Sequence, residues 1–435
     1  MGDVAIGFAG FGLLLGIIAL GVPIAYAGAF VGIIGLLVIG GSGITFHYLS
    51  SIPYSEVAYY SYTVIPLYIL IGEFAFIGGF AEGAYKTGQK WFGNFPGGLG
   101  IATIVGGAGF GAVSGASVAS SAVLAKICIP EMRKQGYDKS MSAGAVAASA
   151  NLSSMIPPSG LMIIYSIFTE QPLGKLFLAG VLPGILIVAL FSIVILIQVS
   201  KNHHGTHLKK KITWLERVAS LRHCWGIALI AFVVLGGIYT GVFSATEAGG
   251  AGAFLAFGMT LFSGSFSWQK LKMGLLNAVK TSVMVLFILV GIMVFTHFLT
   301  LTRLPVVVSG FIIGLPVSPV ILIILILGFY LFLGMFFDPI SMMALTLPLL
   351  FPTIVSLGFD PIWFGVLCIL MCEVGMITPP VGINCYVVFS ASPDIALGDV
   401  FKGVIPFVIA NLVAAAIMIV FPKIVLFLPG LSGGG

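Results

Sequence analysis

The sequence predicts an all-α polytopic membrane protein built as an inverted-topology repeat, with about ten transmembrane helices and two re-entrant helical hairpins. Three observations support this fold class: the composition, the length of the apolar runs, and a repeated pattern of helix-breaking residues. Of the 435 residues, 59% are hydrophobic and only 8% are charged. Soluble domains carry about a quarter charged residues. The chain is therefore expected to lie in a lipid bilayer, which excludes cytosolic enzymes, nucleic-acid-binding proteins and disordered proteins.

The apolar runs are long and continuous, which indicates helices rather than the alternating strands of a membrane β-barrel. A helix needs about 20 apolar residues to cross the hydrocarbon region. The run at 305–315 is too short to cross and is expected to lie along the interface. The predicted apolar runs are 4–20, 22–40, 55–80, 97–130, 138–170, 176–200, 222–243, 245–266, 273–302, 305–315, 317–355, 360–391 and 400–425.

Two of these runs, 97–130 and 317–355, are too long for one crossing and are interrupted near the middle. The interruptions are GAVSGAS (111–117) and GMFFDPIS (334–341). Each half is short for a full crossing. Two half-helices that enter the membrane and return fit both runs, so we expect a re-entrant hairpin in each.

The basic residues indicate how the chain is oriented. If both hairpins are re-entrant, most lysines and arginines fall on one side of the membrane, many of them in a basic loop at 201–221. The positive-inside rule makes that side cytoplasmic and places both termini in the periplasm. Lys126 and Lys280 lie inside predicted spans, and we expect Lys126 to extend its amine toward the membrane surface.

The chain also repeats itself at a constant offset, which we call the repeat shift and define as the offset that carries Pro130 onto Pro352. Five predicted crossings separate equivalent points, and an odd number inverts the second copy, which is a transporter architecture. The pairs that this shift aligns are Pro130 with Pro352, Gly136 with Gly358, Asp138 with Asp360, Pro157 with Pro379, Pro158 with Pro380, and Gly160 with Gly382.

The repeated Pro-Pro pairs interrupt helices at 151–160 and 375–384. Two successive prolines force unwound backbone, which lipid tolerates only beside a cavity or protein. Freed carbonyl groups suit an alkali cation, whereas the N-termini of the helices that restart favour an anion. The pattern indicates cation-coupled uptake of an anion. The alternative is that each Pro-Pro pair merely kinks a packing helix, but two copies at the same spacing favour a site.

Polar side chains gather at these breaks and differ between the halves. The repeat shift aligns Asp338 with Ala116, so we expect chemically different cation sites. We expect Asp338 to contact a cation or the substrate; the alternative is that it caps the half-helix starting at Pro339. The candidates are Ser114, Ser117, Asn151, Ser153 and Ser159 in the first half, and Asp338, Ser341, Thr378 and Asn384 in the second.

Other ionisable residues in the spans carry weaker hypotheses. Glu73 and Glu247 lie outside the hairpins, which favours helix-to-helix hydrogen bonds. Glu373 directly precedes a break and could serve either structure or transport. The chain has no GxxxxGK[ST] phosphate-binding loop and no Ser-His-Asp or HExxH constellation. A nucleotide-driven pump within this chain is therefore excluded, and an enzyme is disfavoured.

These residues resemble a known family, the large membrane subunit of tripartite ATP-independent periplasmic (TRAP) transporters of the dicarboxylate type. The resemblance is carried by the stretch 114–184, which contains the run IPEM…GYD…IPPS, and by PLYILIGEFAF (66–76), GFDP (358–361) and TPPVGINCYV (378–387). It covers nearly the whole chain.

The resemblance implies a sodium-coupled importer of small organic acids, either carboxylates or sulfonates, in the bacterial inner membrane. It implies a periplasmic substrate-binding protein and a separate small membrane subunit of four helices as partners. It also implies an elevator, in which a transport domain slides against a scaffold. A stand-alone sodium-dicarboxylate symporter of related fold is the alternative. An intramembrane enzyme or assembly subunit is a third reading, which predicts no sodium-dependent flux.

The resemblance also assigns roles to residues. At least two sodium ions are expected, near Ser114 and Asn151 in one half and near Asp338 and Thr378 in the other. The residues expected to face the substrate are Ser117, Ser153, Pro157, Pro158, Ser159, Ser341, Pro379, Pro380 and Asn384.

The expected domain organisation applies the scaffold and transport domain that the resemblance implies to both halves of the repeat. Scaffold helices are expected in 1–90 and 222–315, on either side of the basic loop. Transport-domain elements are expected in 91–200, with the hairpin 97–130 and the broken helix 138–170, and in 316–425, with the hairpin 317–355 and the broken helix 360–391. Residues 426–435 are expected to form a tail.

Overall fold

The computed structural model describes residues 2–202 and 212–431, and the regular secondary structure of this part of the chain is helical, without strands. The rest of the basic loop and of the expected tail lies outside the described residues. The helices of the first half are α1 (Gly2–Ala19), α2 (Ile24–Val57), the short 3₁₀ helix η1 (Tyr60–Thr63), α3 (Val64–Ile77), α4 (Phe80–Phe92), α5 (Gly98–Ser114), α6 (Ser117–Lys134), α7 (Lys139–Met155), α8 (Gly160–Thr169) and α9 (Leu173–Asn202).

The second half follows the same plan. Its helices are α10 (Trp214–Ser220), the 3₁₀ helix η2 (Leu221–His223), α11 (Trp225–Ala231), the π-helical turn η3 (Phe232–Gly236), α12 (Gly237–Tyr239), α13 (Ala245–Phe262), α14 (Trp268–Leu301), α15 (Leu304–Ile313), α16 (Pro319–Gly334), α17 (Pro339–Ser356), α18 (Pro361–Gly375), α19 (Ile383–Ala391), α20 (Leu397–Val420) and α21 (Lys423–Leu431).

The lengths and apolarity of these helices confirm an all-α multi-pass membrane protein. Within the described residues, seven helices are long and apolar enough to cross a membrane, and up to nine spans result if each of two bent pairs is one span. One bent pair is α7 with α8, which meet at 43° across the Pro-Pro break. Four shorter apolar helices, among them α5, α16 and α18, add to this framework.

Helices end inside both of the interruptions that the sequence indicated. α5 ends at Ser114 and α6 begins at Ser117, with Gly115 in the left-handed conformation (φ 62°) that favours glycine. α16 ends at Gly334 and α17 begins at Pro339. A second pair of breaks falls at the Pro-Pro sequences, between α7 and α8 and between α18 and α19.

The two halves keep the repeat shift at the level of whole elements. α6 begins at Ser117 and α17 at Pro339, while α7 begins at Lys139 and α18 at Pro361. Each half then runs through a broken helix into a long helix, α9 or α20. The order of a helix pair, a broken helix and a long helix therefore occurs twice.

Some elements differ from the expected runs. The run 55–80 is divided, because α2 continues to Val57 and α3 starts only at Val64. α10 lies within the predicted loop 201–221, and α21 extends through residues 426–431 of the expected tail. The start of α10 has a sequence that suits a helix start. The side chain of Thr213 accepts the backbone N–H of Glu216, and the side chain of Glu216 accepts the backbone N–H of Thr213, which together form a capping box.

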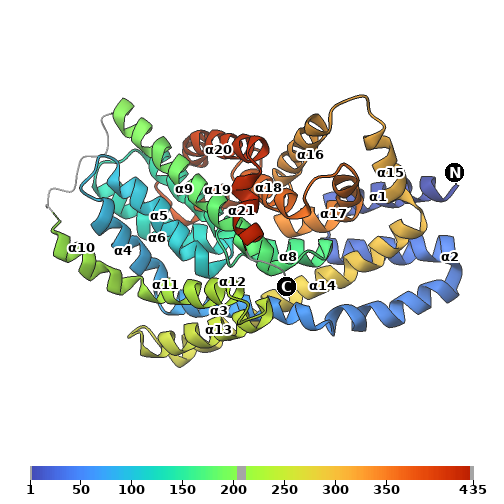
Figure 1. Cartoon of the computed structure of the whole chain (residues 1–435), viewed down its shortest axis with the longest axis horizontal. Coiled ribbons are helices and arrows are strands. Elements are labelled where there is room, and N and C mark those ends of the chain that lie inside the picture. Colours follow the sequence, from blue (N-terminus) through green and yellow to red (C-terminus); the bar gives the residue numbers. More distant parts are fainter. Residues whose placement is uncertain (1, 203–211, 432–435) are drawn as a thin grey trace.

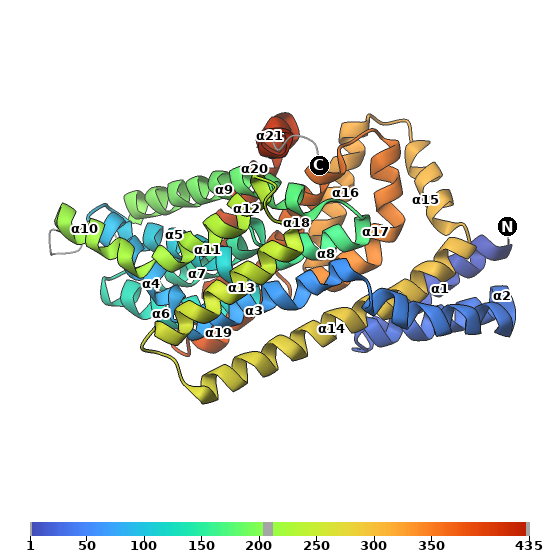
Figure 2. The same ribbon diagram turned by 60° about the horizontal axis from the view of Figure 1, so that its bottom comes forward.

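The long helices α2 and α14 lie side by side along one side of the molecule, away from α9 and α20 (Figures 1 and 2). Small residues let their backbones approach closely. A Cβ atom added at Gly291 would lie 2.1 Å from the carbonyl oxygen of Ala25, so only glycine fits there.

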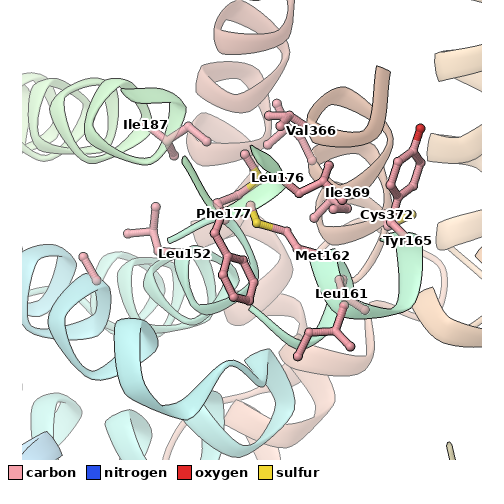
Figure 3. Close-up of a cluster of buried hydrophobic side chains, with 14 of the residues drawn as sticks. Leu152, Leu161, Met162, Tyr165, Leu176, Phe177, Ile187, Val366, Ile369 and Cys372 are labelled. Carbon is pink, nitrogen blue, oxygen red and sulfur yellow. The ribbon is translucent and has the colours of Figure 1, made fainter. Parts of the chain in front are cut away.

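A second packed region joins the two broken helices. Figure 3 shows Leu152 of α7, Met162 of α8, Phe177 of α9 and Ile369 of α18 in one cluster of buried side chains. Because α7 and α18 hold equivalent places in the two halves, this cluster packs the equivalent helices of both halves together. The breaks at their ends are held at fixed positions as a result.

Candidate functional site

A cavity of about 1040 Å³ lies where the breaks meet the long helices. One wall comes from the beginning of α2, from α3 and from the middle of α14. The opposite wall comes from α8 and from the breaks beside α6, α17 and α18. This volume is at the upper end of the range for pockets that bind small molecules.

Five of the residues singled out from the sequence line this cavity: Ser114, Ser117, Pro158, Asp338 and Ser341. The cavity therefore brings the first hairpin, the first Pro-Pro break and the second hairpin together. The other predicted site residues lie outside the lining and keep the status of predictions: Asn151, Ser153, Pro157, Ser159, Thr378, Pro379, Pro380 and Asn384.

A short chain of hydroxyl groups attaches the first hairpin to α7. The Oγ atoms of Ser114 and Ser120 are 2.8 Å apart, and the Ser153 hydroxyl donates to Ser120 Oγ at 2.7 Å. The backbone N–H of Gly160 donates to the carbonyl oxygen of Gly115 at 3.2 Å. The break in the hairpin is thus fixed against both helices of the Pro-Pro break.

Glu373 brings a carboxylate to the same place from the other half. It is 1% exposed and borders the cavity at the end of α18. Its Oε1 accepts hydrogen bonds from the hydroxyls of Ser154, at 2.6 Å, and Ser117, at 3.1 Å. Its Oε2 is buried without a hydrogen-bond partner. A buried carboxylate oxygen that lacks a partner is costly, so it is a candidate ligand for a cation.

Asn151 and Glu373, which the repeat shift aligns, are in direct contact. The Asn151 amide donates to the Glu373 carbonyl oxygen at 2.6 Å, and the Asn384 amide donates to Asn151 Oδ1 at 2.8 Å. The Asn384 Oδ1 atom is buried without a hydrogen-bond partner. Because these two equivalent residues are in contact, the two halves of the repeat meet at this point, beside the cavity.

Asp338 caps the start of α17, which was the alternative to the expected contact with a cation or the substrate. Its Oδ1 accepts the backbone N–H of Ser341 at 3.0 Å at the start of α17. Within the described chain, its other carboxylate oxygen has no hydrogen-bond or ion-pair partner, and the side chain is exposed at the cavity. The cap therefore leaves one charged oxygen available to a cation.

Two further predicted residues serve the local backbone. Thr378 donates to the Val374 carbonyl oxygen at 2.6 Å. Ser159 caps α8, where it accepts the Met162 N–H at 3.4 Å, and its own hydroxyl donates to the Ser154 carbonyl oxygen at 2.6 Å. Their hydroxyl oxygens keep lone pairs, but the hydroxyl protons are already engaged.

The two glutamates outside the hairpins have different outcomes. Glu73 of α3 interacts with Asn277 of α14, in agreement with the expected helix-to-helix contact. The same expectation for Glu247 was wrong. Its carboxylate accepts the backbone N–H of Ser244 at 2.8 Å and forms a capping box at the start of α13, its own helix. The sequence signal for this was present, since Ser followed by Glu three residues later is a helix-start pattern.

Sequence reasoning left out Ser120 and Ser154, assigned no role to Lys280, and left Glu373 open between structure and transport. The repeat shift could have identified Glu373, because it aligns with Asn151. The contacts of Ser120 and Ser154 depend on helix packing, which the shift does not report. Among the described residues, no group of three histidine, cysteine, aspartate or glutamate side chains is placed to hold a metal ion.

Comparison with known proteins gives the family. The family model described as "Tripartite ATP-independent periplasmic transporter, DctM component" matches residues 11–424. The C4-dicarboxylate TRAP transporter large permease protein DctM of Pseudomonas aeruginosa is 33% identical over 386 residues, covering 86% of this chain and 87% of that protein. The 2,3-diketo-L-gulonate TRAP transporter large permease protein YiaN of Escherichia coli is 31% identical, covering 97% and 96%.

Two further comparisons concern a longer relative and a solved structure of the same fold. The isethionate TRAP transporter permease protein DctMQ of Oleidesulfovibrio alaskensis is 28% identical, and the match covers 97% of this chain but 66% of that protein. The YdaH transporter of Alcanivorax borkumensis shares the fold, with a TM-score of 0.63 over 87% of this chain and 89% of that chain at 12% identity. The relatives are named as transporter permeases rather than enzymes. The chain belongs to the DctM family, the large permease component of the tripartite ATP-independent periplasmic transporters.

Proposed function

We propose that this chain imports a small organic acid together with sodium ions and receives that acid from a periplasmic binding protein. The observation that carries the proposal is the cavity between the long helices and the breaks. It is large enough for a small organic molecule and borders both hydroxyl groups and carboxylates. In inverted-repeat transporters, substrate and ion sites lie where broken helices meet.

The substrate class follows from the cavity and from the relatives. The relatives are named for C4-dicarboxylates, 2,3-diketo-L-gulonate, isethionate and sialic acid, all of which are small organic acids. The hydroxyl of Ser341 and the start of α6 at Ser117, a helix start that has no side-chain cap, border the space that such an acid would occupy. A helix N-terminus and hydroxyl donors both favour an anion.

Sodium coupling is supported by oxygen atoms that lack partners. Glu373 Oε2 and Asn384 Oδ1 are buried acceptors without hydrogen bonds, on two residues joined through Asn151. Carboxylate and carbonyl oxygens are the ligands that hard cations prefer. We propose at least two sodium sites, one near Ser114 and Asn151 and one near Asp338 and Thr378. Glu373 would supply negative charge between them.

The proposed mechanism is an elevator. The regions expected as scaffold contribute α2, α3 and α14 to one cavity wall, and the regions expected as transport domain contribute the breaks to the other. Movement of one wall along the other would carry the bound acid across the bilayer. A separate four-helix membrane subunit would enlarge the scaffold in the bacterial inner membrane, with both termini of this chain periplasmic.

The requirement for a binding protein tests this function against the stand-alone symporter. The permease and its small membrane partner would be reconstituted into liposomes, and uptake of labelled succinate, isethionate and a sialic acid would be measured with and without the cognate binding protein. Uptake that requires the binding protein supports the tripartite importer. Equal uptake without it supports a stand-alone sodium-coupled symporter.

A further inference from the structure

A single lysine faces the cavity from α14. Lys280 is the only lysine or arginine among the residues that line the cavity, within the part of the chain that the structure describes. It lies on the wall opposite the hairpin breaks, next to Val279, Thr281 and Val283. Every other charged residue in this lining, Asp338 and Glu373, is acidic.

The position of Lys280 along α14 argues against a role at the membrane surface. The helix begins at Trp268, and Lys270 and Lys272 follow within its first two turns. Lys280 lies eight residues beyond Lys272, which corresponds to about 12 Å along the helix axis. The four-carbon stem of a lysine is about half that length. Its amine therefore does not reach the level of the basic residues that begin the helix.

No ion pair within residues 2–202 and 212–431 neutralises the charge of Lys280. The ion pairs found among the described residues join Lys86 to Glu82, Lys90 to Glu216 and Lys134 to Glu131, and none includes Lys280. Of the two acids in the cavity, Asp338 caps α17, and Glu373 accepts two serine hydroxyls. A charged residue inside a membrane span is costly and needs a partner, which makes a functional role the default hypothesis.

We propose that Lys280 binds the carboxylate or sulfonate group of the transported acid. This inference rests on the proposed function, because it takes the cavity to be the substrate site. The ammonium group would pair with the anionic group from the α14 wall, while the Ser341 hydroxyl and the start of α6 on the opposite wall would hold the same molecule. The substrate would then contact both walls at once. Movement of the breaks along α14 would separate it from Lys280, so the ion pair would belong to one end state of the transport cycle.

Direct binding tests this role without requiring transport. The purified permease with its small membrane partner, in lipid nanodiscs, would be titrated with succinate, isethionate and a sialic acid at saturating sodium, by calorimetry. Lys280→Gln is expected to weaken binding of the acid that the wild type binds by about tenfold or more. Lys280→Arg is expected to retain binding within a few-fold. Lys270→Gln, on the same helix but outside this cavity, is expected to match the wild type.

Each outcome bears on a separate claim. Wild-type affinity in Lys280→Gln overturns the role of Lys280 and leaves the proposed function standing. A wild type that binds none of the three acids contradicts the proposed function and, with it, this inference. Sodium-dependent thermal stabilisation of each variant shows that the fold is intact. If Lys280→Gln does not fold, Lys280→Met removes the charge with a side chain suited to lipid. The affinity of Lys280→Met for the acid, compared with that of the wild type, then decides the question.

Discussion

Glu373 and Asn151 show how one pair of residues connects the two halves of the molecule. They occupy equivalent places under the repeat shift, yet one is an acid and the other an amide. The amide bonds to the backbone of the acid, and the carboxylate turns to Ser117 and Ser154. An inverted repeat with identical halves would place two like side chains here. The difference gives one negative charge to a contact that both halves share.

Replacing Glu373 tests the proposed cation site. Glu373→Gln keeps the size of the side chain and can still accept the two serine hydroxyls, but it removes the charge. We expect the sodium concentration that gives half-maximal thermal stabilisation of the purified permease to rise about tenfold or more. Glu82→Gln, an exposed carboxylate on α4 paired with Lys86, is the matched control. An unchanged sodium response in Glu373→Gln would exclude Glu373 from the ion sites.

Asp338 allows the cap and the charge to be separated. Asparagine is as good a helix cap as aspartate, so Asp338→Asn preserves the start of α17 and removes only the charge at the cavity. Sodium dependence of uptake is expected to weaken, with little change in melting temperature. Asp360→Asn at the start of α18 provides the control, because Asp360 caps that helix outside the cavity. If both variants respond to sodium alike, Asp338 acts only as a cap.

For single residues, the sequence predicted which side chains lie near the site better than it predicted which side chains contact one another. Ser114, Ser117, Asp338 and Ser341 were identified from their place at helix breaks, and the cavity brings them together. Asn151 and Asn384 were identified too, but they bond to one another behind the lining. Direction of a side chain depends on how its helix is rotated against its neighbours. A break in a pattern does not contain that information.

Among the elements, α7 and α20 pack more closely than side chains would permit. A Cβ atom added at Gly403 of α20 would lie 1.8 Å from the carbonyl oxygen of Ser140 in α7, and one added at Gly144 would lie 2.2 Å from the backbone of Gly403. Real Cβ atoms do not approach that closely, so the two helices would have to separate. Small residues at such crossings are what allow membrane helices to associate.

Gly403→Ala tests this close approach. It is expected to destabilise the permease by about 1–3 kcal/mol and to lower its melting temperature in detergent. Gly398→Ala lies on the same helix where an added Cβ meets nothing within 4 Å, so it is expected to leave the melting temperature unchanged or raise it. Equal melting temperatures for the two variants would show that α7 and α20 do not pack as closely as described.

Helix breaks were easier to predict than helix lengths. Proline and glycine act locally, so the interruptions at 111–117, 334–341 and the two Pro-Pro sequences could be placed from the sequence. The helical stretch from residue 42 to Val57 could not be placed in this way. α2 consists of two helices joined at a kink at Gly41 (φ 68°), and the second of them contains Pro53. Both residues normally end helices. Gly41 does end the first of the two helices here, where the expected run 22–40 stops, whereas Pro53 lies within the second.

On the scale of the whole molecule, the cavity lies between two groups of helices, and each group contains helices from both halves of the repeat. α2 and α14 form one body of long helices, and α7, α8, α9 and α18 meet in another around the cluster of Figure 3. The family resemblance implies a division into a scaffold and a transport domain, which stays a prediction. The sequence could not place the cavity, because the cavity depends on how the two groups face each other. That arrangement is also what an elevator requires.

The measurement that tests the account most directly is concentrative uptake driven by sodium. Liposomes containing the permease and its small membrane partner would receive the binding protein and a labelled organic acid outside, with an inward sodium gradient or with equal sodium on both sides. We expect accumulation of the acid above its external concentration only with the gradient, and loss of that accumulation when a sodium ionophore dissipates it. Accumulation that is the same with and without the sodium gradient would contradict sodium-coupled import.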